Sequence, residues 1–510
     1  MVSVAKFRNL LAFLWPIERH EIKKIVPMMI MMFLICFNHS ILRNAKDALV
    51  ITAKSSGVEV IPFIKVWVLL PMAILITLIF TKLSNRFSQE KVFYIITSSF
   101  LLFFGLFIIV IYPLQDYVHP HNLASQLETV LPAGFKGWIA MMRNWSFTLF
   151  YVISELWGSM VLSVLFWGFA NEITTMTEAR RFYSMLGVVA SSASIVSGLA
   201  ANTLTEGVEW ESTLQILIGV IITCGCLTML VFRYMNKTVL QGEEFKDLHS
   251  VKNDSLPKKK LSLQESFAYL ANSKHLICIA TLVVCYNLVI NLVELVWKDQ
   301  VHQLYQASVD YNRYMNYNTS IVGLIATLTS LCMVPLIARF GWTYIALITP
   351  LMMLLTSVGF FGFMLLRADY AQAVVMFTGT MPLAIAVFFG AAQVCLSKAC
   401  KYSVFDATKE MAFIPLSHEL KLKGKAAIDG VGSRLGKSGG SLIHQGLLMI
   451  FATMSASAPY VAVVLSLVIC GWMYAVRILG KQIKVAVARE KTTEATSFSL
   501  VDNQSVLKLG

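Results

Sequence analysis

The chain has 510 residues, of which 57% are hydrophobic and 14% are charged. Ordinary globular proteins carry roughly 25% charged residues, and a soluble chain of this length would divide into several domains that each need a charged surface. The composition therefore excludes a soluble enzyme and predicts a membrane protein. The net charge of +13 does not indicate a nucleic-acid partner, because the Lys and Arg lie between apolar runs, where such residues orient membrane helices.

The first part of the chain predicts a tail followed by six membrane-spanning helices. Residues 1–24 have the basic composition of a cytosolic tail, and we expect no cleavable signal peptide. A span takes about 20 largely apolar residues. Six stretches within residues 25–235 meet that length: 25–52, 62–81, 92–112, 144–170, 180–202 and 213–235.

The second part of the chain repeats this organisation. Residues 236–274 form the longest polar connection and include Lys258, Lys259 and Lys260, which predicts a cytosolic linker. Six more apolar stretches follow within residues 275–480: 275–297, 317–338, 342–366, 371–397, 427–453 and 458–479. The polar segment 481–510 is expected to form a disordered cytosolic tail.

The Lys and Arg are unevenly distributed when alternate connections are assigned to opposite sides of the membrane. With the N-terminus in the cytosol, most of them lie on the cytosolic side, and few lie on the other side: Lys54, Lys136, Lys298, Arg313 and Arg367. This asymmetry favours an even number of spans with both termini in the cytosol. We therefore expect an all-α polytopic membrane protein of about twelve transmembrane helices in two six-helix halves. That layout is major-facilitator-like, and such halves rock about a site near the middle of the membrane.

Charged residues lie inside several predicted spans, where each costs roughly 2.5–3.5 kcal/mol and so indicates a function. In the first span, Arg43, Lys46 and Asp47 are spaced i, i+3 and i+4 and share one helix face. The others are Glu155, Glu294, Arg434 and Lys437. Cations of this kind suit a phosphorylated substrate, since guanidinium and ammonium groups bind phosphate oxygens. The alternative is that pairs such as Arg434 and Glu294 are buried ion pairs that hold helices together.

No pattern indicates a cofactor or a metal. The nine cysteines form no CxxC pair, and His39 and His444 lack a second ligand at metal spacing. Residues 430–438 (GVGSRLGKS) have the wrong glycine spacing for a phosphate-binding loop and indicate a small-residue helix that a neighbour can approach closely. We therefore expect neither a cofactor nor nucleotide hydrolysis.

Several blocks of sequence resemble the ATP/ADP translocase family, the nucleotide transporters of plastids and of obligate intracellular bacteria such as chlamydiae. These blocks are 41–47 (ILRNAKD), 155–159 (ELWGS) with 166–171 (FWGFAN), 291–298 (NLVELVWK), 424–429 (GKAAID) and 436–440 (GKSGG). The resemblance implies a transporter of the cell inner membrane that takes ATP and ADP as substrates. It assigns the transport-critical charges to Lys46, Glu155, Glu294 and Lys437. Asn171, which ends one block, is a further candidate, with capping of a helix end as its alternative role.

The resulting hypothesis is exchange of external ATP for internal ADP by alternating access. Arg43, Lys46, Arg434 and Lys437 would hold the polyphosphate, while Glu155 and Glu294 would balance these cations in the empty cavity or couple transport. The alternatives are proton-coupled import of nucleoside triphosphates and exchange of other nucleotides. One departure from the family bears on them: its members often have Asp-Thr where this chain has Asn44 and Ala45, a change that could alter phosphate number or coupling. We expect the protein to lie in the lipid bilayer, and a monomeric transporter is compatible with the sequence.

Overall fold

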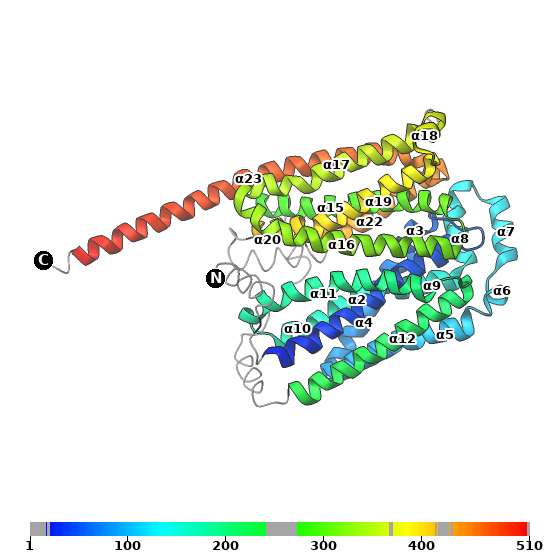
Figure 1. The fold of residues 1–510 in the computed structure, drawn as a ribbon, viewed down its shortest axis with the longest axis horizontal. Helices are drawn as coiled ribbons and strands as arrows, with labels where there is room; N and C mark the ends of the chain where they lie inside the picture. The colour runs from blue at the N-terminus through cyan, green and yellow to red at the C-terminus, as the bar shows by residue number, and fades with distance from the viewer. Residues whose placement is uncertain are drawn as a thin grey trace. The chain divides into compact units, whose positions relative to one another are not determined.

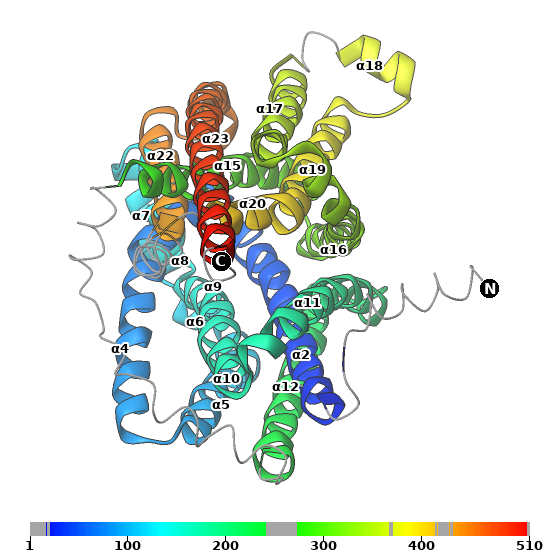
Figure 2. The same ribbon diagram turned by 90° about the vertical axis from the view of Figure 1, so that its left-hand side faces the viewer.

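The computed structural model describes residues 21–240, 273–366, 371–413 and 432–506, together with positions 17, 416 and 428. Throughout these residues every regular element is a helix (Figures 1 and 2). The chain forms two compact units. The first unit comprises Met1–Lys258 and Val301–Thr327, and the second comprises Lys259–Gln300 and Leu328–Gly510.

The first unit is assembled around α2, whose apolar residues are buried over most of its length. This helix packs against α9, α11 and α12, and α12 also packs against α5. The longer elements of the unit are α2 (Ile22–Ile51), α4 (Leu70–Arg86), α5 (Gln89–Leu106), α9 (Trp145–Trp157), α11 (Met176–Leu204) and α12 (Trp210–Tyr234). Shorter segments complete it: α3 (Val60–Phe63), η2 (Ile64–Leu69), η3 (Phe107–Ile111), α6 (Gln115–Val118), α7 (His121–Val130), η4 (Ala133–Phe135), α8 (Lys136–Arg143), η5 (Gly158–Phe166), α10 (Trp167–Ile173) and η6 (Met235–Val239).

The second unit holds most of α15 and the helices that follow α16. Within it α17 packs against α19 and α23, and α22 packs against α23. The bounds are α15 (Lys274–Leu304), α16 (Ser308–Phe340), α17 (Trp342–Leu366), α18 (Ala371–Thr378), α19 (Pro382–Cys400), η7 (Lys401–Phe405), α20 (Asp406–Ala412), α22 (Ser433–Phe451) and α23 (Met454–Val506).

The start of α16 belongs to the first unit because it packs closely on α11. A Cβ atom on Gly198 would lie 2.3 Å from the Asn316 carbonyl oxygen, and one on Gly323 would lie 2.9 Å from the Ser191 carbonyl oxygen. The Ser320 hydroxyl also donates to the Ile195 carbonyl oxygen at 2.9 Å. The predicted halves, 25–235 and 275–480, therefore differ from the two compact units in the segment Val301–Thr327.

Ten of the described helical segments are long and apolar enough to cross a membrane. Nine of them coincide with predicted spans, and Pro382–Ala412 overlaps the predicted span 371–397. The remaining two predicted spans, 317–338 and 427–453, correspond to α16 and α22. The prediction of an all-α membrane protein is confirmed.

Two details of the sequence prediction are wrong. The tenth span was expected at 371–397, but Gly379 adopts a left-handed φ of 67° between α18 and α19, and Pro382 begins α19. Glycine after a helix and proline at its first position are the usual end and start signals. The expected disordered tail 481–510 is helical as far as Val506 (Figure 1), because residues 481–506 include no glycine or proline that would end α23.

The start of α11 is tied to α2 by a charged contact at one end of the helices. Lys24 Nζ lies 2.9 Å from Glu178 Oε2, and Glu178 closes a capping box with Thr175. Burial raises the pKa of Glu178, but hydrogen bonds from the Thr175 backbone and from Lys24, together with the Lys24 charge, lower it below its usual value. The contact therefore stabilises the ionised carboxylate where α11 begins.

Glycines allow α22 to lie directly against α15, as the small-residue pattern predicts. A Cβ atom on Gly436 would lie 2.6 Å from the Val284 carbonyl oxygen, and one on Gly440 would lie 3.1 Å from Asn291 Cβ. By contrast, a Cβ atom on Gly446 would meet nothing within 4 Å. The close approach positions the backbone of α22 beside α15.

Gly436→Ala should lower the melting temperature of the protein, whereas Gly446→Ala should not. Both changes favour the helix by about 1 kcal/mol, so the difference between them reports the clash with the Val284 carbonyl, for which overpacking costs about 1–3 kcal/mol. Thermal unfolding of the purified variants measures this difference. Equal melting temperatures would show that α22 can shift away from α15 without loss.

Candidate functional site

Lys46 is buried in the first unit between two carboxylates. Its Nζ lies 2.9 Å from Asp47 Oδ1 and 2.9 Å from Glu155 Oε1, and its side chain is only 3% exposed. The same ammonium lies 3.7 Å from the ring centroid of Tyr151. Two opposite charges and an aromatic face offset the cost of burying a cation inside a membrane helix. The predicted residues Lys46 and Glu155 are thus brought together, and Asp47 is a partner of Lys46.

Glu155 is positioned by close packing of α9 on α2. It lies near the end of α9, one turn before the π-helical segment η5 begins at Gly158. A Cβ atom on Gly158 would lie 2.6 Å from His39 Cε1 on α2, so glycine is required for this approach. The Trp157 indole Nε1 donates to the Ile35 carbonyl oxygen at 3.3 Å. Since π-helical segments are frequent at functional sites, this local geometry favours a role for Glu155.

A second cluster of charges lies in the second unit around Glu294. Glu294 Oε1 lies 3.2 Å from Lys398 Nζ on α19 and 3.5 Å from Lys298 Nζ, one turn further along α15. The side chains of Glu294 and Lys398 are 17% and 13% exposed. Glu294 therefore pairs with these two lysines and not with Arg434, the partner that the sequence suggests.

Arg434 and Lys437 lie in the first turns of α22 and have exposed side chains. The backbone of Lys437 is fixed to α15, because Asn291 Nδ2 donates to its carbonyl oxygen at 3.0 Å. Asn291 is one helical turn before Glu294 on α15. The second unit therefore presents cations on both helices that flank this part of α15, Lys398 on α19 and Lys437 on α22.

The other two predicted site residues lie in the first unit. Arg43 is half-buried on α2, one turn before Lys46. Asn171 is exposed on α10 and accepts a hydrogen bond from the Tyr183 hydroxyl. The Asn171 contact supports the structural alternative, in which this residue holds the end of α10 on α11.

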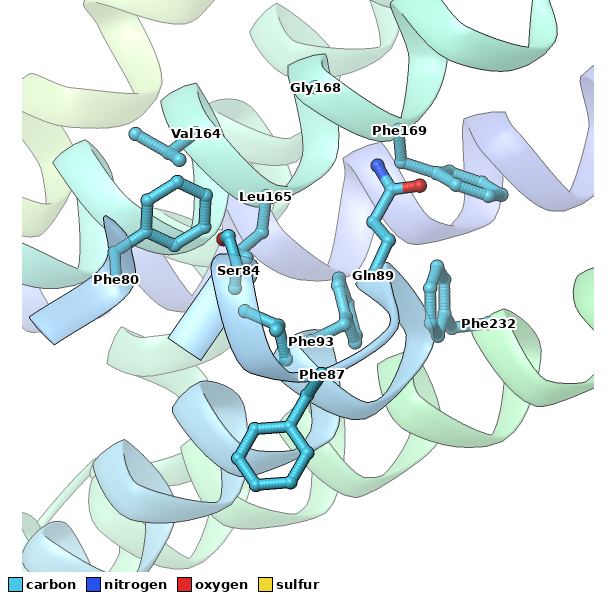
Figure 3. Close-up of a pocket in the computed structure, with 11 residues that line it drawn as sticks. Phe80, Ser84, Phe87, Gln89, Phe93, Val164, Leu165, Gly168, Phe169 and Phe232 are labelled. Atoms are coloured by element: carbon cyan, nitrogen blue, oxygen red, sulfur yellow. The ribbon is translucent and has the colours of Figure 1, made fainter. Parts of the chain in front are cut away.

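An aromatic pocket in the first unit does not have the lining that a polyphosphate needs. It lies among α4, α5, η5, α10 and α12, and the side chains in Figure 3 include the stacked pair Phe93 and Phe232, whose ring centroids are 3.9 Å apart. The polar side chains of its lining are those of Ser84 and Gln89, and the lining contains no charged residue. The charged clusters remain the candidates for phosphate binding.

The profile of the TLC ATP/ADP transporter family matches residues 2–483. The chain belongs to this family. ADP,ATP carrier protein 1 of Chlamydia muridarum is 45% identical over 502 residues, which cover 96% of this chain and 94% of that protein. The chloroplastic ADP,ATP carrier protein 1 of Arabidopsis thaliana is 42% identical and is matched over 91% of this chain and 75% of its own length. The resemblance noted in the sequence is thereby confirmed.

Solved structures of transporters share the fold of this TLC transporter. A point mutant of the nucleoside transporter NupG matches with a TM-score of 0.56 at 11% identity, over 89% of this chain and 99% of that chain. The partially occluded, inward-open xylose transporter XylE from E. coli matches with a TM-score of 0.52 at 12% identity, over 91% and 98%. These similarities confirm the transporter-like, all-helical fold, and family membership confirms a multi-pass membrane transporter rather than an enzyme.

Asn44, where this TLC transporter departs from the family pattern, is directed at α16. Its Nδ2 donates to Asn316 Oδ1 at 2.8 Å and to Thr319 Oγ1 at 3.0 Å. Asn316 in turn donates to Asn202 Oδ1 on α11 at 3.0 Å. Asn44 therefore links α2 to α11 and α16, and the expected effect on phosphate number has no support from its contacts.

Sequence reasoning about this TLC transporter missed Lys398 and misplaced Lys298. Lys298 was assigned to an external connection, but it is buried within α15. Lys398 directly follows the predicted span 371–397, where a lysine is expected at the membrane surface, but α19 continues to Cys400. The signal that could have found it is the glutamate on another span, which needs a cation as partner.

Proposed function

We propose that this TLC transporter exchanges ATP for ADP across the cell inner membrane by alternating access, with both termini in the cytosol. The observation that carries the proposal is the ion pair between buried Lys46 and half-buried Glu155 in helices that can cross a membrane, in a chain 45% identical to an ADP,ATP carrier. The distribution of Lys and Arg along the sequence supports the orientation of the termini.

In this proposal the nucleotide phosphates compete with carboxylates for the same cations. Arg43 and Lys46 in the first unit, and Arg434 and Lys437 in the second, bind phosphate oxygens during the transport cycle. Glu155 and Glu294 neutralise lysines while no nucleotide is bound. Asn171 is kept as a further candidate contact.

Obligatory exchange follows from these charges. The four proposed cations outnumber the two glutamates, so excess positive charge remains inside the membrane when no nucleotide is bound. Such charge is costly, and the transporter therefore switches between its inward-open and outward-open states readily only with a nucleotide bound. The nucleotide gradients then supply the driving force, without hydrolysis, metal or cofactor, and a single chain is sufficient.

Uptake of radiolabelled ATP by intact bacterial cells that express the protein tests this proposal. We expect the accumulated label to leave rapidly when unlabelled ADP is added outside, and a protonophore to have no effect on uptake. Cells carrying the empty vector provide the background. Label that does not exchange, together with uptake that collapses with the protonophore, would contradict exchange and identify a proton-driven nucleotide importer.

A further inference from the structure

The two units contain the same ion-pair arrangement with the charges exchanged. In the first unit, Lys46 on α2 pairs with Glu155 on α9 at 2.9 Å. In the second unit, Glu294 on α15 pairs with Lys398 on α19 at 3.2 Å. Glu155 and Lys398 are in equivalent local positions, since each lies one turn before a π-helical segment, η5 or η7. Lys398 thus occupies the place in the second unit that Glu155 has in the first.

A buried tryptophan fixes each of these helix pairs. The Trp157 indole on α9 donates to the Ile35 carbonyl oxygen on α2, and the Trp297 indole on α15 donates to the Val387 carbonyl oxygen on α19 at 3.1 Å. In both units the tryptophan is on the helix that carries the glutamate. With the backbones held in this way, the flexible four-carbon side chain of lysine is the part of each ion pair that can move.

The Lys398 ammonium lies farther from the glutamate of its pair than the Lys46 ammonium does. Lys46 lies 2.9 Å from each of two carboxylates, whereas Lys398 lies 3.2 Å from a carboxylate oxygen that is also 3.5 Å from Lys298. Of the two lysines around Glu294, Lys398 is the more accessible, with a side chain 13% exposed against 5% for Lys298. A phosphate offers an ammonium several anionic oxygens at once, whereas Lys398 shares the Glu294 oxygen that it contacts with Lys298.

We propose that Lys398 is a further phosphate-binding residue, held by Glu294 until a nucleoside di- or triphosphate takes over its ammonium. This assignment rests on the proposed function. Lys437, one of the cations already proposed for the phosphates, is linked through its carbonyl oxygen to Asn291, one turn from Glu294. The polyphosphate can therefore draw on cations from α19 and α22, on either side of the same stretch of α15.

Equilibrium binding of ATP to the purified, full-length transporter tests the assignment. We expect Lys398→Gln to weaken ATP binding at least tenfold, about 1.4 kcal/mol, and Lys398→Arg to retain most of the affinity. Glu294→Gln should tighten ATP binding, because it removes the group that competes for Lys398. In the double variant the tightening should disappear, since the lysine that Glu294 restrains is then absent.

Lys401→Gln is the matched control. Lys401 also forms a lysine–carboxylate pair at 3.2 Å, with Asp406, but on η7 and with a more exposed side chain. This variant should bind ATP as the wild type does. Unchanged ATP affinity in folded Lys398→Gln, or Glu294→Gln that does not tighten binding, would overturn the assignment and leave Lys398 as a structural partner of Glu294. Absence of ATP binding by the wild-type protein would instead overturn the proposed function, and this assignment with it.

Discussion

Replacing Lys437 by alanine should reduce ATP uptake by about 10- to 100-fold without changing the amount of protein in the membrane or its melting temperature. The size follows from the loss of one charge-assisted bond to phosphate, worth about 1.5–3 kcal/mol. Folding should be unaffected because the Lys437 side chain is exposed and its contact to α15 uses the backbone carbonyl, which alanine keeps. Initial uptake rates over a range of ATP concentrations, with immunoblots of the membrane fraction, measure both effects.

The control for Lys437→Ala is Lys481→Ala, which removes another exposed lysine, from α23. It should transport ATP at the wild-type rate. Wild-type uptake by Lys437→Ala would remove this residue from the phosphate site and leave Arg434 and the charged residues of α15 and α19 as the candidates in the second unit.

Lys46→Ala should abolish uptake and, unlike Lys437→Ala, should also destabilise the protein. The substitution leaves the buried Asp47 and the half-buried Glu155 without the ammonium that both contact at 2.9 Å. Breaking a buried ion pair by removing one partner costs about 3–5 kcal/mol, so we expect a clearly lower melting temperature in detergent and less protein in the membrane. The sequence alone suggests that Lys46→Ala and Lys437→Ala behave alike, whereas burial separates them.

A second substitution distinguishes the two roles of Lys46. Adding Asp47→Asn and Glu155→Gln to Lys46→Ala removes the two negative charges that contact Lys46 in the wild type, so the melting temperature should recover in part while uptake remains absent. Recovery of uptake together with stability would mean that Lys46 serves only to neutralise the carboxylates. A wild-type melting temperature for Lys46→Ala alone would contradict the stabilising role of the ion pairs.

The helices and the most deeply placed charges could be predicted from the sequence because both follow from the cost of polar groups in a bilayer. This reasoning located Lys46, Glu155 and Glu294, since each interrupts a long apolar run. It did not find Lys398, which directly follows the predicted end of a span, and a shift of a few residues in that end decides whether a lysine lies at the surface or in a cluster.

The sequence also does not show which charged residues form ion pairs or where the helices depart from α-helical geometry. The choice of Lys298 and Lys398 over Arg434 as partners of Glu294 depends on which helices pack together. In the sequence Gly379 is one of 28 glycines, and only the structure shows the positive φ with which it separates α18 from α19. The π-helical segments η5 and η7 have no distinctive composition, because they differ from α-helix in hydrogen-bond register rather than in residue type.

These π-helical segments give two charged side chains a way to turn. The hydrogen bonds of a π segment join residues five apart, whereas those of an α-helix join residues four apart. When a π segment becomes α-helical, its one extra residue moves to another place along the helix. The helix before the segment then rotates by about 100°, the angle between successive residues of an α-helix. Glu155 and Lys398 each lie one turn before such a segment. A change of register in η5 or η7 would therefore swing the carboxylate away from Lys46, or the ammonium away from Glu294, while both helices remain fully hydrogen-bonded.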